Sequence, residues 1–569
     1  MTTTVNAVGA ASHDGMGWHG IDWGQAHRMV RRLQVRIAKA VSEGLWNKAK
    51  ALQRLLTCSF YGKAVAVKRV TENHGKKTAG VDKVTWNTPE QKAKAINSLK
   101  RRGYQPQPLR RVHIPKANGK LRPLGIPTMR DRAMQALHLF ALQPIAETTA
   151  DHNSYGFRPE RACRDAAAQC FAALVSKNSA QWVLDADISG CFDNISHDWL
   201  LANIPMDKTV LGKWLKSGFV EQGNWFPTQA GTPQGGIASP TLANMVLDGM
   251  EIELAKHFGA KTSRKGRKGK VNFIRYADDF VITGATRETL EQAKLIIGDF
   301  LIERGLSLSE EKTKIVHIDE GFDFLGWNIR KYGGKLLIKP AKKNVQAFLR
   351  KIRLIIKENR TAKQENVIRL LNPVIRGWAN YHQNQVAKQT FSEVDHAIWK
   401  KLWQWACRRH PNKPLRWVKG RYFKSEGLRN WVFGTRVKTE DGSVIMVKLV
   451  NASDTPIRRH IKIKAEAHPF NPAWEEYFEN RLGLQMKESL KGKNKLLYLW
   501  YAQEGKCPNC NERITKDTGW NVHYTRRKTV GGENMVTNLT LLHPNCHRHI
   551  HNREKKVSAG SGDTGFMEA

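Results

Sequence analysis

FIRYADDFVIT, residues 273–283, is an apolar run with two adjacent carboxylates, Asp278 and Asp279, near its centre. Its β-branched and aromatic residues predict two short strands, and the carboxylates fall where a tight turn would join them. Charged groups in an apolar setting cost free energy unless a cation or a proton neutralises them. The stretch therefore predicts a hairpin within a sheet, with a cation-binding tip.

A second apolar run with embedded acids lies upstream in VLDADISGCFDNI, residues 183–195. Asp185 and Asp187 are two residues apart, so they share one face of a strand, and Asp185 remains a rival to Asp187. Carboxylates from two strands can hold two Mg²⁺ ions roughly 3.5–4 Å apart, one at an attacking 3′ hydroxyl and one at the leaving pyrophosphate. The two runs predict phosphoryl transfer, against the alternative that YADD is a plain surface turn.

Length and charge narrow the class of protein. The chain has 569 residues, which suggests three or four domains, and 93 Lys and Arg against 51 Asp and Glu give a net charge of +42. This excess indicates a polyanionic partner, with nucleic acid as the first candidate. A hydrophobic content of 41% excludes a wholly disordered basic chain.

The sequence carries no sign of a membrane partner. No apolar run approaches the roughly 18 residues of a membrane-spanning helix. The first residues, MTTTVNAVGAASHDGMG, lack the basic start and apolar core of a secretory signal. We therefore expect an intracellular protein, cytoplasmic and associated with the nucleoid.

Basic residues gather in several segments that are predicted to reach phosphates. A helical pattern over residues 23–70 has a cationic face, made by Arg28, Arg31, Arg32 and Arg36. Residues 108–128 predict a hairpin around residues 117–119, and its basic arms suit a triphosphate: Arg110, Arg111, Lys116, Lys120 and Arg122. Residues 261–270, KTSRKGRKGK, predict an exposed loop.

The composition changes after about residue 335. Residues 341–405 have a helical pattern, in which Trp399 and Trp403 share one face and are predicted to be core residues. Residues 407–425 are basic with aromatic residues between the charges. Their predicted contacts with RNA or DNA phosphates are Arg408, Arg409, Lys413, Arg416, Lys419 and Arg421.

A Cys/His-rich unit closes the chain over residues 496–555. Cys507 and Cys510 are followed by His543 and Cys546, and two such pairs make a tetrahedral site with three sulfur ligands and one nitrogen ligand. These ligand types and this spacing predict structural Zn²⁺.

In this order the motifs resemble the group II intron-encoded reverse transcriptases, also called maturases. The resemblance runs from about residue 23 to 551, through NSYGFRPERACRDAA (153–167), LDADISGCFDNI (184–195), AGTPQGGIASPTLAN (230–244), RYADDF (275–280), LSLSEEKTKIVH (306–317) and GFDFLGW (321–327). RGWANYH (376–382) then resembles the maturase thumb, which separates intron-encoded enzymes from retroviral ones.

The resemblance implies roles for single residues. Asp187, Asp278 and Asp279 match the catalytic, metal-binding triad, with the carbonyl of Ile188 as a further Mg²⁺ ligand. Phe192 matches the ring that excludes a 2′ hydroxyl, which favours deoxynucleotides. The other residues matched to the nucleotide pocket are Lys116, Arg122, Arg110 and Gln234.

The terminal unit resembles the HNH endonucleases, in which a ββα fold holds one divalent ion. His523, His547 and His551 match the ligands of that ion, and Asn538 matches the central asparagine. The family has two adjacent histidines, the second being the general base, whereas Tyr524 follows His523 here. Tyrosine, with an unperturbed pKa of about 10, is a poor base at neutral pH.

Together these patterns predict a multidomain α+β protein. It comprises a right-hand polymerase with an antiparallel palm sheet, an α-helical thumb and a zinc-containing ββα module. The expected domains are a disordered start (1–20), a basic helical extension (21–80), fingers and palm (81–332), the maturase thumb (333–449), a DNA-binding connector (450–495), the HNH-like module (496–556) and a disordered tail (557–569).

The expected function is that of a mobile-element enzyme. It would copy intron RNA by target-primed reverse transcription, assist splicing and cut target DNA, with intron RNA, target DNA and dNTPs as partners. A narrower hypothesis keeps the polymerase but gives the HNH module DNA binding without cleavage. Three further hypotheses compete with the mobile-element function: an RNA-folding cofactor with a vestigial polymerase, a reverse transcriptase with another purpose, and a pure homing endonuclease.

Overall fold

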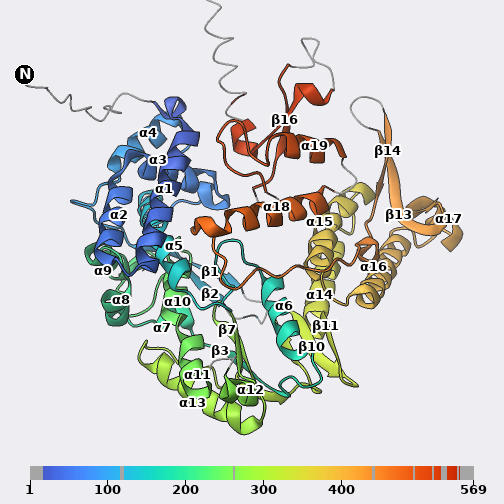
Figure 1. Cartoon of the computed structure of the whole chain (residues 1–569). Helices are drawn as coiled ribbons and strands as arrows, with labels where there is room; N and C mark the ends of the chain where they lie inside the picture. Colours follow the sequence, from blue (N-terminus) through green and yellow to red (C-terminus); the bar gives the residue numbers. More distant parts are fainter. Residues whose placement is uncertain are drawn as a thin grey trace, which may run out of the picture.

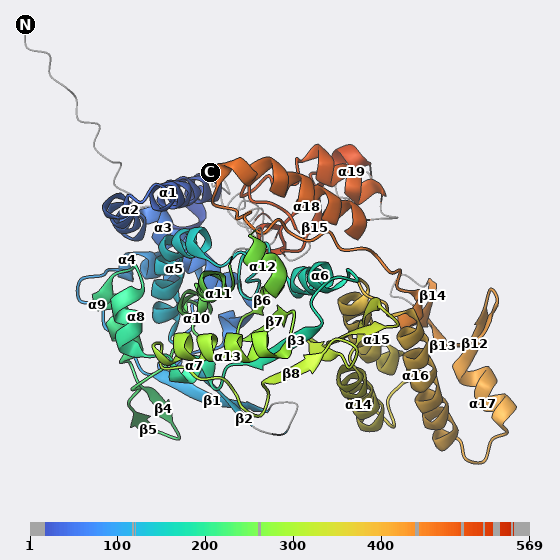
Figure 2. The same cartoon turned by 60° about the horizontal axis from the view of Figure 1, so that its bottom comes forward.

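The computed structural model describes residues 17–115, 119, 121–259, 263–438, 443–490, 494–515, 518–526, 535–547 and 550. Figures 1 and 2 show a helical N-terminal part, a central sheet, a helical thumb, and a C-terminal part that returns to the N-terminal helices. Lys116, predicted to bind the nucleotide, and His551, predicted to bind a divalent ion, lie outside the described residues. Lys120 of the basic hairpin also lies outside them.

The N-terminal part is a group of helices around one buried helix. Its elements are α1 (Trp23–Ser42), α2 (Trp46–Cys58), α3 (Phe60–Glu72), α4 (Pro89–Ser98) and α5 (Met129–Thr149). The expected disorder over residues 1–20 is wrong for Trp18–Gly20, which form the 3-10 helix η1. Trp18 is 2% exposed, and its ring lies 4.8 Å from that of Trp23, so burial of this large side chain fixes the segment.

The palm is an antiparallel sheet, as predicted, and it has four strands in the order β6-β7-β3-β8. Its strands are β3 (Trp182–Asp187), β6 (Asn272–Tyr276), β7 (Asp279–Gly284) and β8 (Lys314–His317). The helix α13 (Arg287–Ile302) contacts β3 and β7, while α6 (Cys163–Leu174) contacts β6. The apolar residues of β3 and β7 are thereby buried, and the acidic ends of the strands stay at one edge.

The predicted basic hairpin is present as β1 (Leu109–Pro115) and β2 (Leu121–Ile126), which pair antiparallel. Strand β4 (Phe219–Glu221) adds in parallel beside β1, and β5 (Asn224–Phe226) follows it. Short helices complete this half of the molecule: α7 (Cys191–Asn194), α8 (His197–Asn203), α9 (Lys208–Leu215), α10 (Ser239–Leu247) and α11 (Met250–Phe258). Within the stretch expected to be a loop, Arg264–Gly269 form helix α12.

The thumb begins after a small sheet of β9 (Phe322–Phe324), β10 (Trp327–Tyr332) and β11 (Lys335–Pro340). The predicted boundary at residue 333 cuts the β10–β11 hairpin, because Gly333 and Gly334 form its tight turn, with φ of 55° and 78°, rather than a linker. The predicted helices follow as α14 (Lys342–Glu358), α15 (Gln364–His382), α16 (Lys388–Arg409) and α17 (Leu415–Tyr422). A further sheet was not predicted: β12 (Phe423–Glu426), β13 (Arg429–Lys438) and β14 (Val444–Lys448).

The RGWANYH motif joins the thumb to the palm. Tyr381 on α15 stacks on Trp327 of β10 at 4.7 Å and donates a hydrogen bond of 2.8 Å to the carbonyl of Leu325. The indole of Trp378 donates to the side chain of Asn344 on α14 at 2.8 Å. One face of this motif is therefore structural, because it fixes α15 against the sheet that follows the palm.

The segment after the thumb is anchored on the palm by one buried carboxylate. Asp165 of α6 accepts hydrogen bonds from His460 at 2.8 Å, from the backbone N–H of Ile463 at 2.8 Å and from Arg481 at 3.0 Å. The chain then forms α18 (Glu475–Ser489) and α19 (Asn494–Ala502). Residues 450–490, expected to connect two domains, are thus packed against the polymerase in this structure.

The C-terminal unit rests on the first helices of the chain. Its strands β15 (Asn521–Tyr524) and β16 (Leu539–Leu542) pair antiparallel. His27 of α1 pairs with Glu512 at 3.4 Å, and Arg31 donates to the carbonyl of Pro469 and lies over the ring of Phe470.

None of the helices in the described part of the chain is long and apolar enough to cross a membrane.

We predict that Asp165→Asn releases residues 460–481 from the palm. Burial raises the pKa of Asp165, but the bonds from His460, Ile463 and Arg481 outweigh it and hold the pKa below its ordinary value of 3.8. Because its pKa is lowered in the folded state, the Asp165 carboxylate stabilises the fold at neutral pH. That stabilisation is lost only as the pH falls through the folded-state pKa. Removing the charge leaves the guanidinium of Arg481 buried without its charged partner, at a cost of about 3–5 kcal/mol.

Hydrogen exchange of residues 460–481 at pH 7 measures the effect of Asp165→Asn. The exposed Glu466→Gln, in the same segment, serves as the matched control. Faster exchange in Asp165→Asn alone supports the anchor, and equal exchange in both variants contradicts it.

Candidate active site and metal centre

Three carboxylates meet at one edge of the palm sheet. Asp187 is the last residue of β3 and lies directly opposite Asp279, the first residue of β7, in the antiparallel register. Asp278 lies in the turn that joins β6 to β7. Residues directly opposite each other in such a pair have Cβ atoms about 5 Å apart. Residues almost a hundred positions apart are thereby brought to one place.

The ammonium of Lys312 lies among these carboxylates. Its Nζ forms an ion pair with Asp187, and this bond, with Asp279 and Asp278 also contributing, raises the pKa of Lys312. A cation therefore contacts Asp187 and lies within electrostatic range of the other two carboxylates. Lys312 stands in the LSLSEEKTKIVH motif, but the sequence pattern predicted no role for it. The one indication in the sequence is that Lys312 stands just before β8, the strand that pairs with β3.

Burial and mutual repulsion act on these acids. Burial first, and then the charges of Asp278 and Asp187, raise the pKa of Asp279 to about 7, and burial likewise raises the pKa of Asp278. Asp185 lies two residues further into β3, opposite Val281, and burial followed by repulsion from Asp279 raises its pKa to about 7. Asp187 and not Asp185 is therefore level with Asp279 at the edge.

Buried Arg275 braces the turn from behind. Its side chain is 0% exposed and pairs with Asp248 at 2.5 Å, with the side chain of Asn244 at 3.1 Å and with the carbonyl of Ala277 at 3.3 Å. Its backbone bonds to residues 153 and 155 tie the same turn to the loop before α6. Because hydrogen-bonded buried charges hold one geometry, the carboxylates are presented by a fixed scaffold.

The turn also depends on close backbone approach. Ala277 has φ of 59°, in the left-handed region that side chains disfavour. A Cβ on Gly156 would lie 2.3 Å from the backbone nitrogen of Ala277, so only glycine fits beneath the turn. Asn244 holds this glycine in place by donating to its carbonyl at 2.8 Å.

The residues predicted to form the nucleotide pocket lie in the same region. Phe192 is half-buried on α7, and the amide of Gln234 donates to the carboxylate of Asp193 at 3.2 Å. Arg122 on β2 is close enough to Asp278 for its charge to oppose the rise in the pKa of that acid. Arg110 lies on β1, the other arm of the same hairpin, opposite Ile126.

The predicted zinc ligands come together. One ligand atom from each of Cys507, Cys510, His543 and Cys546 lies within 4.8 Å of all the others, and the cysteines are buried. Within the described residues this is the group of His, Cys, Asp and Glu side chains that satisfies such a limit. Three thiols and one imidazole in this geometry fit Zn²⁺.

Three of the four residues matched to the second ion site are described. The ring of His523 on β15 lies 5.4 Å from that of His547, at 82°. Asn538 clamps the loop after β15, since its side chain accepts from the N–H of Arg526 at 2.7 Å and donates to the carbonyl of Arg526 at 3.0 Å. Tyr524 follows His523 on the strand, points to the opposite face and packs, half-buried, against the hydrophobic core.

The basic residues predicted to bind nucleic acid differ in what they contact. Arg409 donates to the carbonyls of Arg360 and Ala362, both at 2.8 Å, and Arg31 bonds to Pro469, so both have structural partners. Lys419 lies 4.5 Å above the ring of Trp431, and Lys413 lies 5.8 Å above that of Trp417. The others are exposed: Arg28, Arg32, Arg36, Arg408, Arg416 and Arg421.

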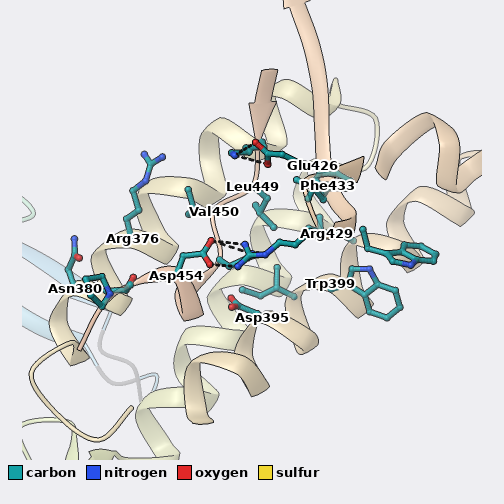
Figure 3. Close-up of a pocket in the computed structure, with 18 of the residues that line it drawn as sticks. Arg376, Asn380, Asp395, Trp399, Glu426, Arg429, Phe433, Leu449, Val450 and Asp454 are labelled. Atoms are coloured by element: carbon teal, nitrogen blue, oxygen red, sulfur yellow. Dashed lines mark hydrogen bonds and ion pairs between the residues drawn. The ribbon is translucent and has the colours of Figure 1, made fainter. Parts of the chain in front are cut away.

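A cavity of about 760 Å³ lies between the thumb helices and the sheet that follows them. Figure 3 shows its bidentate ion pair between Arg429 and Asp454, with bonds of 2.6 and 2.9 Å. Trp399 is half-buried in the wall of this cavity and lies edge-on to Trp431, with ring centroids 5.5 Å apart. Trp403 lies edge-on to the same Trp431 and packs against the thumb core. Both tryptophans predicted to be core residues thus lie at the border of the thumb core.

Four family models match the chain. They are the N-terminal domain of reverse transcriptase at residues 18–99, reverse transcriptase (RNA-dependent DNA polymerase) at 114–329, the group II intron maturase-specific domain at 345–423 and HNH endonuclease at 507–553. Their order matches the order of parts in the structure, from the N-terminal helices through the palm and thumb to the zinc-ligand cluster.

Whole proteins match as well. Group II intron-encoded protein LtrA of Lactococcus lactis subsp. cremoris is 30% identical over 442 residues, covering 61% of this chain and 72% of the relative. Protein YkfC of Escherichia coli strain K12 is 33% identical over 338 residues, covering 52% of this chain and 87% of the relative. A solved telomerase structure from Candida albicans has 12% identity, a TM-score of 0.32 and covers 56% and 64% of the two chains, a likeness that supports no conclusion.

We predict that Gly156→Ala disables template-directed DNA synthesis without unfolding the protein. The new Cβ displaces the Ala277 backbone and with it Asp278 and Asp279, and misplacing reactive groups by about 1 Å costs roughly 100-fold in rate. Gly298→Ala on α13 is the matched control, because its Cβ meets nothing within 4 Å. Initial rates of primer extension check this; a Gly156→Ala rate equal to that of Gly298→Ala would refute it.

Proposed function

The chain belongs to the family of group II intron-encoded proteins, and from this we propose which of its residues carry each activity. It is an RNA-directed DNA polymerase that also carries a maturase-specific domain and an HNH domain. We assign polymerisation to Asp187, Asp278 and Asp279. The observation that carries the assignment is the register of Asp187 opposite Asp279, with Asp278 in the adjoining turn.

The donor set fits hard divalent cations. Carboxylate and carbonyl oxygens are the ligands that Mg²⁺ prefers, and Asp187, Asp278, Asp279 and the carbonyl of Ile188 supply them. Lys312 already places a positive charge among the carboxylates, which supports cation binding at this edge. When bound, two Mg²⁺ ions would supply activation of the primer 3′ hydroxyl and neutralisation of the pyrophosphate.

The residues around the triad would bind and orient the nucleotide. Arg122 and Lys116 belong to the basic hairpin and would hold the triphosphate of a dNTP, with Arg110 as a further candidate. Phe192 would lie under the sugar, where its ring excludes a 2′ hydroxyl. Gln234, held by Asp193, would border the same pocket. Once displaced from Asp187, Lys312 would donate a proton to the leaving pyrophosphate.

We propose intron RNA as both the template and the main partner. The maturase-specific domain and the relation to LtrA support RNA binding, and the net charge of +42 suits a polyanion. The exposed cations of α1 and of residues 408–421 would contact phosphates of the intron or of target DNA. A target DNA strand would then supply the primer for reverse transcription.

For the C-terminal module we propose one structural Zn²⁺ and one divalent ion at a DNA-cutting site. Cys507, Cys510, His543 and Cys546 would hold the zinc, whose removal would unfold the module. His523 and His547, with His551, would hold the second ion, and Asn538 fixes the loop beside it. Because Tyr524 faces the core, the general base comes from elsewhere in the module; the competing hypothesis is a module that binds DNA without cutting it.

We predict that Asp278→Ala lowers DNA synthesis on an RNA template by about 1,000-fold or more, because a metal ligand is lost and with it the ion that would neutralise the developing negative charge. Intron RNA binding and splicing assistance persist, since neither uses this carboxylate. Asp319→Ala, at an exposed acid after β8, is the matched control. Primer extension and splicing of the flanking intron, measured side by side, give the result; synthesis by Asp278→Ala at the control rate would overturn the assignment.

We further predict that Tyr524→Phe nicks target DNA at the wild-type rate, whereas His523→Ala loses the activity. The side chain of Tyr524 is on the face of β15 opposite to that of His523 and packs against the core, so we expect it to take no part in cleavage. Cleavage of a labelled duplex by the intact ribonucleoprotein provides the measurement. Wild-type protein that never nicks this duplex would favour DNA binding alone, and loss of nicking in Tyr524→Phe would restore tyrosine as a participant.

A further inference from the structure

Phe157 combines two unfavourable features beside the polymerase site. Its side chain is 54% exposed, although it is a large apolar ring, and its backbone has φ of 57°. The left-handed region is disfavoured for residues other than glycine, and such residues persist only where their surroundings determine them fully. An exposed ring held in this conformation calls for an explanation.

The neighbours of Phe157 on the chain are fixed on both sides. Gly156 lies beneath the catalytic turn, with its carbonyl held by Asn244 at 2.8 Å. Arg158 is buried and bonds to both carboxylate oxygens of Glu147, at distances from 2.9 to 3.1 Å, and to the carbonyls of Asp151 and Ser154. The backbone that carries the ring of Phe157 is therefore held on both sides.

The ring of Phe157 meets the ring of Phe192. Their centroids are 6.3 Å apart and the planes are at 78°, an edge-to-face contact. This geometry is one of the two that aromatic pairs prefer. Phe192 lies in α7, a helix of only four residues that follows Gly190 with φ of 53°. Phe192 packs against the hydrophobic core on one side, and the ring of Phe157 borders it on another.

We propose that Phe157 is a specificity-determining positioning residue, which holds the ring of Phe192 where it excludes the 2′ hydroxyl of a ribonucleotide. The proposal rests on the proposed role of Phe192 in the nucleotide pocket and adds a residue to it. A ring excludes one hydroxyl only if it cannot swing aside, because a shift of about 1 Å would make room for an oxygen. Phe157 blocks that movement, and the anchored loop behind it ties sugar selection to the same scaffold that positions Asp278 and Asp279.

A specificity role for Phe157 differs from a merely structural role in its kinetic effect. Damage to the scaffold lowers incorporation of deoxynucleotides and ribonucleotides together and leaves their ratio unchanged. Loss of support for Phe192 raises ribonucleotide incorporation relative to deoxynucleotide incorporation. The ratio of the two kcat/KM values is therefore the informative quantity.

The experiment compares single-nucleotide incorporation of a dNTP and the matching rNTP by the full-length protein on an RNA template. Phe157→Leu keeps an apolar side chain but removes the ring, and we expect it to lower the dNTP/rNTP ratio roughly two- to tenfold, the contribution of one aromatic pair. Phe157→Tyr keeps the ring and retains the ratio. Phe171→Leu is the control, since Phe171 is also an exposed phenylalanine, at 41%, on α6.

Phe192→Val in the same assay separates the two proposals. If Phe192→Val leaves the ratio unchanged, the gate assignment within the proposed function fails. If Phe192→Val lowers the ratio but Phe157→Leu does not, the inference about Phe157 alone is overturned. The double variant adds a further check, because a residue that acts through Phe192 has no additional effect on the ratio once that ring is gone.

Discussion

The mutual repulsion of Asp187, Asp278 and Asp279 at one edge of the palm sheet is the constraint on which the rest of the structure depends. Burial raises the pKa of Asp278 and Asp279, so the fold has to hold acids where they are costly. It does so with a cation in front, Lys312, and a buried guanidinium behind, Arg275. The same feature that makes this edge unfavourable for folding makes it suitable for metal ions and a triphosphate.

The brace behind the carboxylates extends into the whole polymerase. Arg275 is tied to α10 through Asn244 and to the loop before α6 through its backbone. The helix α6 in turn carries Asp165, which holds the chain after the thumb. From there the chain reaches α1, where His27 meets Glu512 of the zinc-ligand unit. The parts that would copy RNA, grip it and bind DNA are thus connected through polar contacts, most of them buried, and not only through the linear chain.

Much of this could be predicted from the sequence, because the signals were local. Apolar runs interrupted by acids predicted the palm strands, and the spacing of Cys507, Cys510, His543 and Cys546 predicted a cluster that the structure brings together. Partners distant in sequence could not be predicted: nothing near Lys312, Arg275 or Asp165 in the chain shows which group each meets. The cationic pattern of α1 favoured phosphate contact at Arg31, whereas the structure places Pro469 there. The burial of Trp18 was not predicted, because a single large apolar residue among small and polar neighbours gives no hydrophobic pattern.

The most direct measurement is anomalous diffraction from crystals of the protein with an RNA template, a DNA primer, a non-hydrolysable dNTP and Mn²⁺. We expect two Mn²⁺ peaks among the carboxylates of Asp187, Asp278 and Asp279, about 3.5–4 Å apart, with Lys312 displaced from Asp187. An ordered primer and dNTP with no metal peak at these residues, or with the metals held by other side chains, would contradict the assignment of the polymerase site.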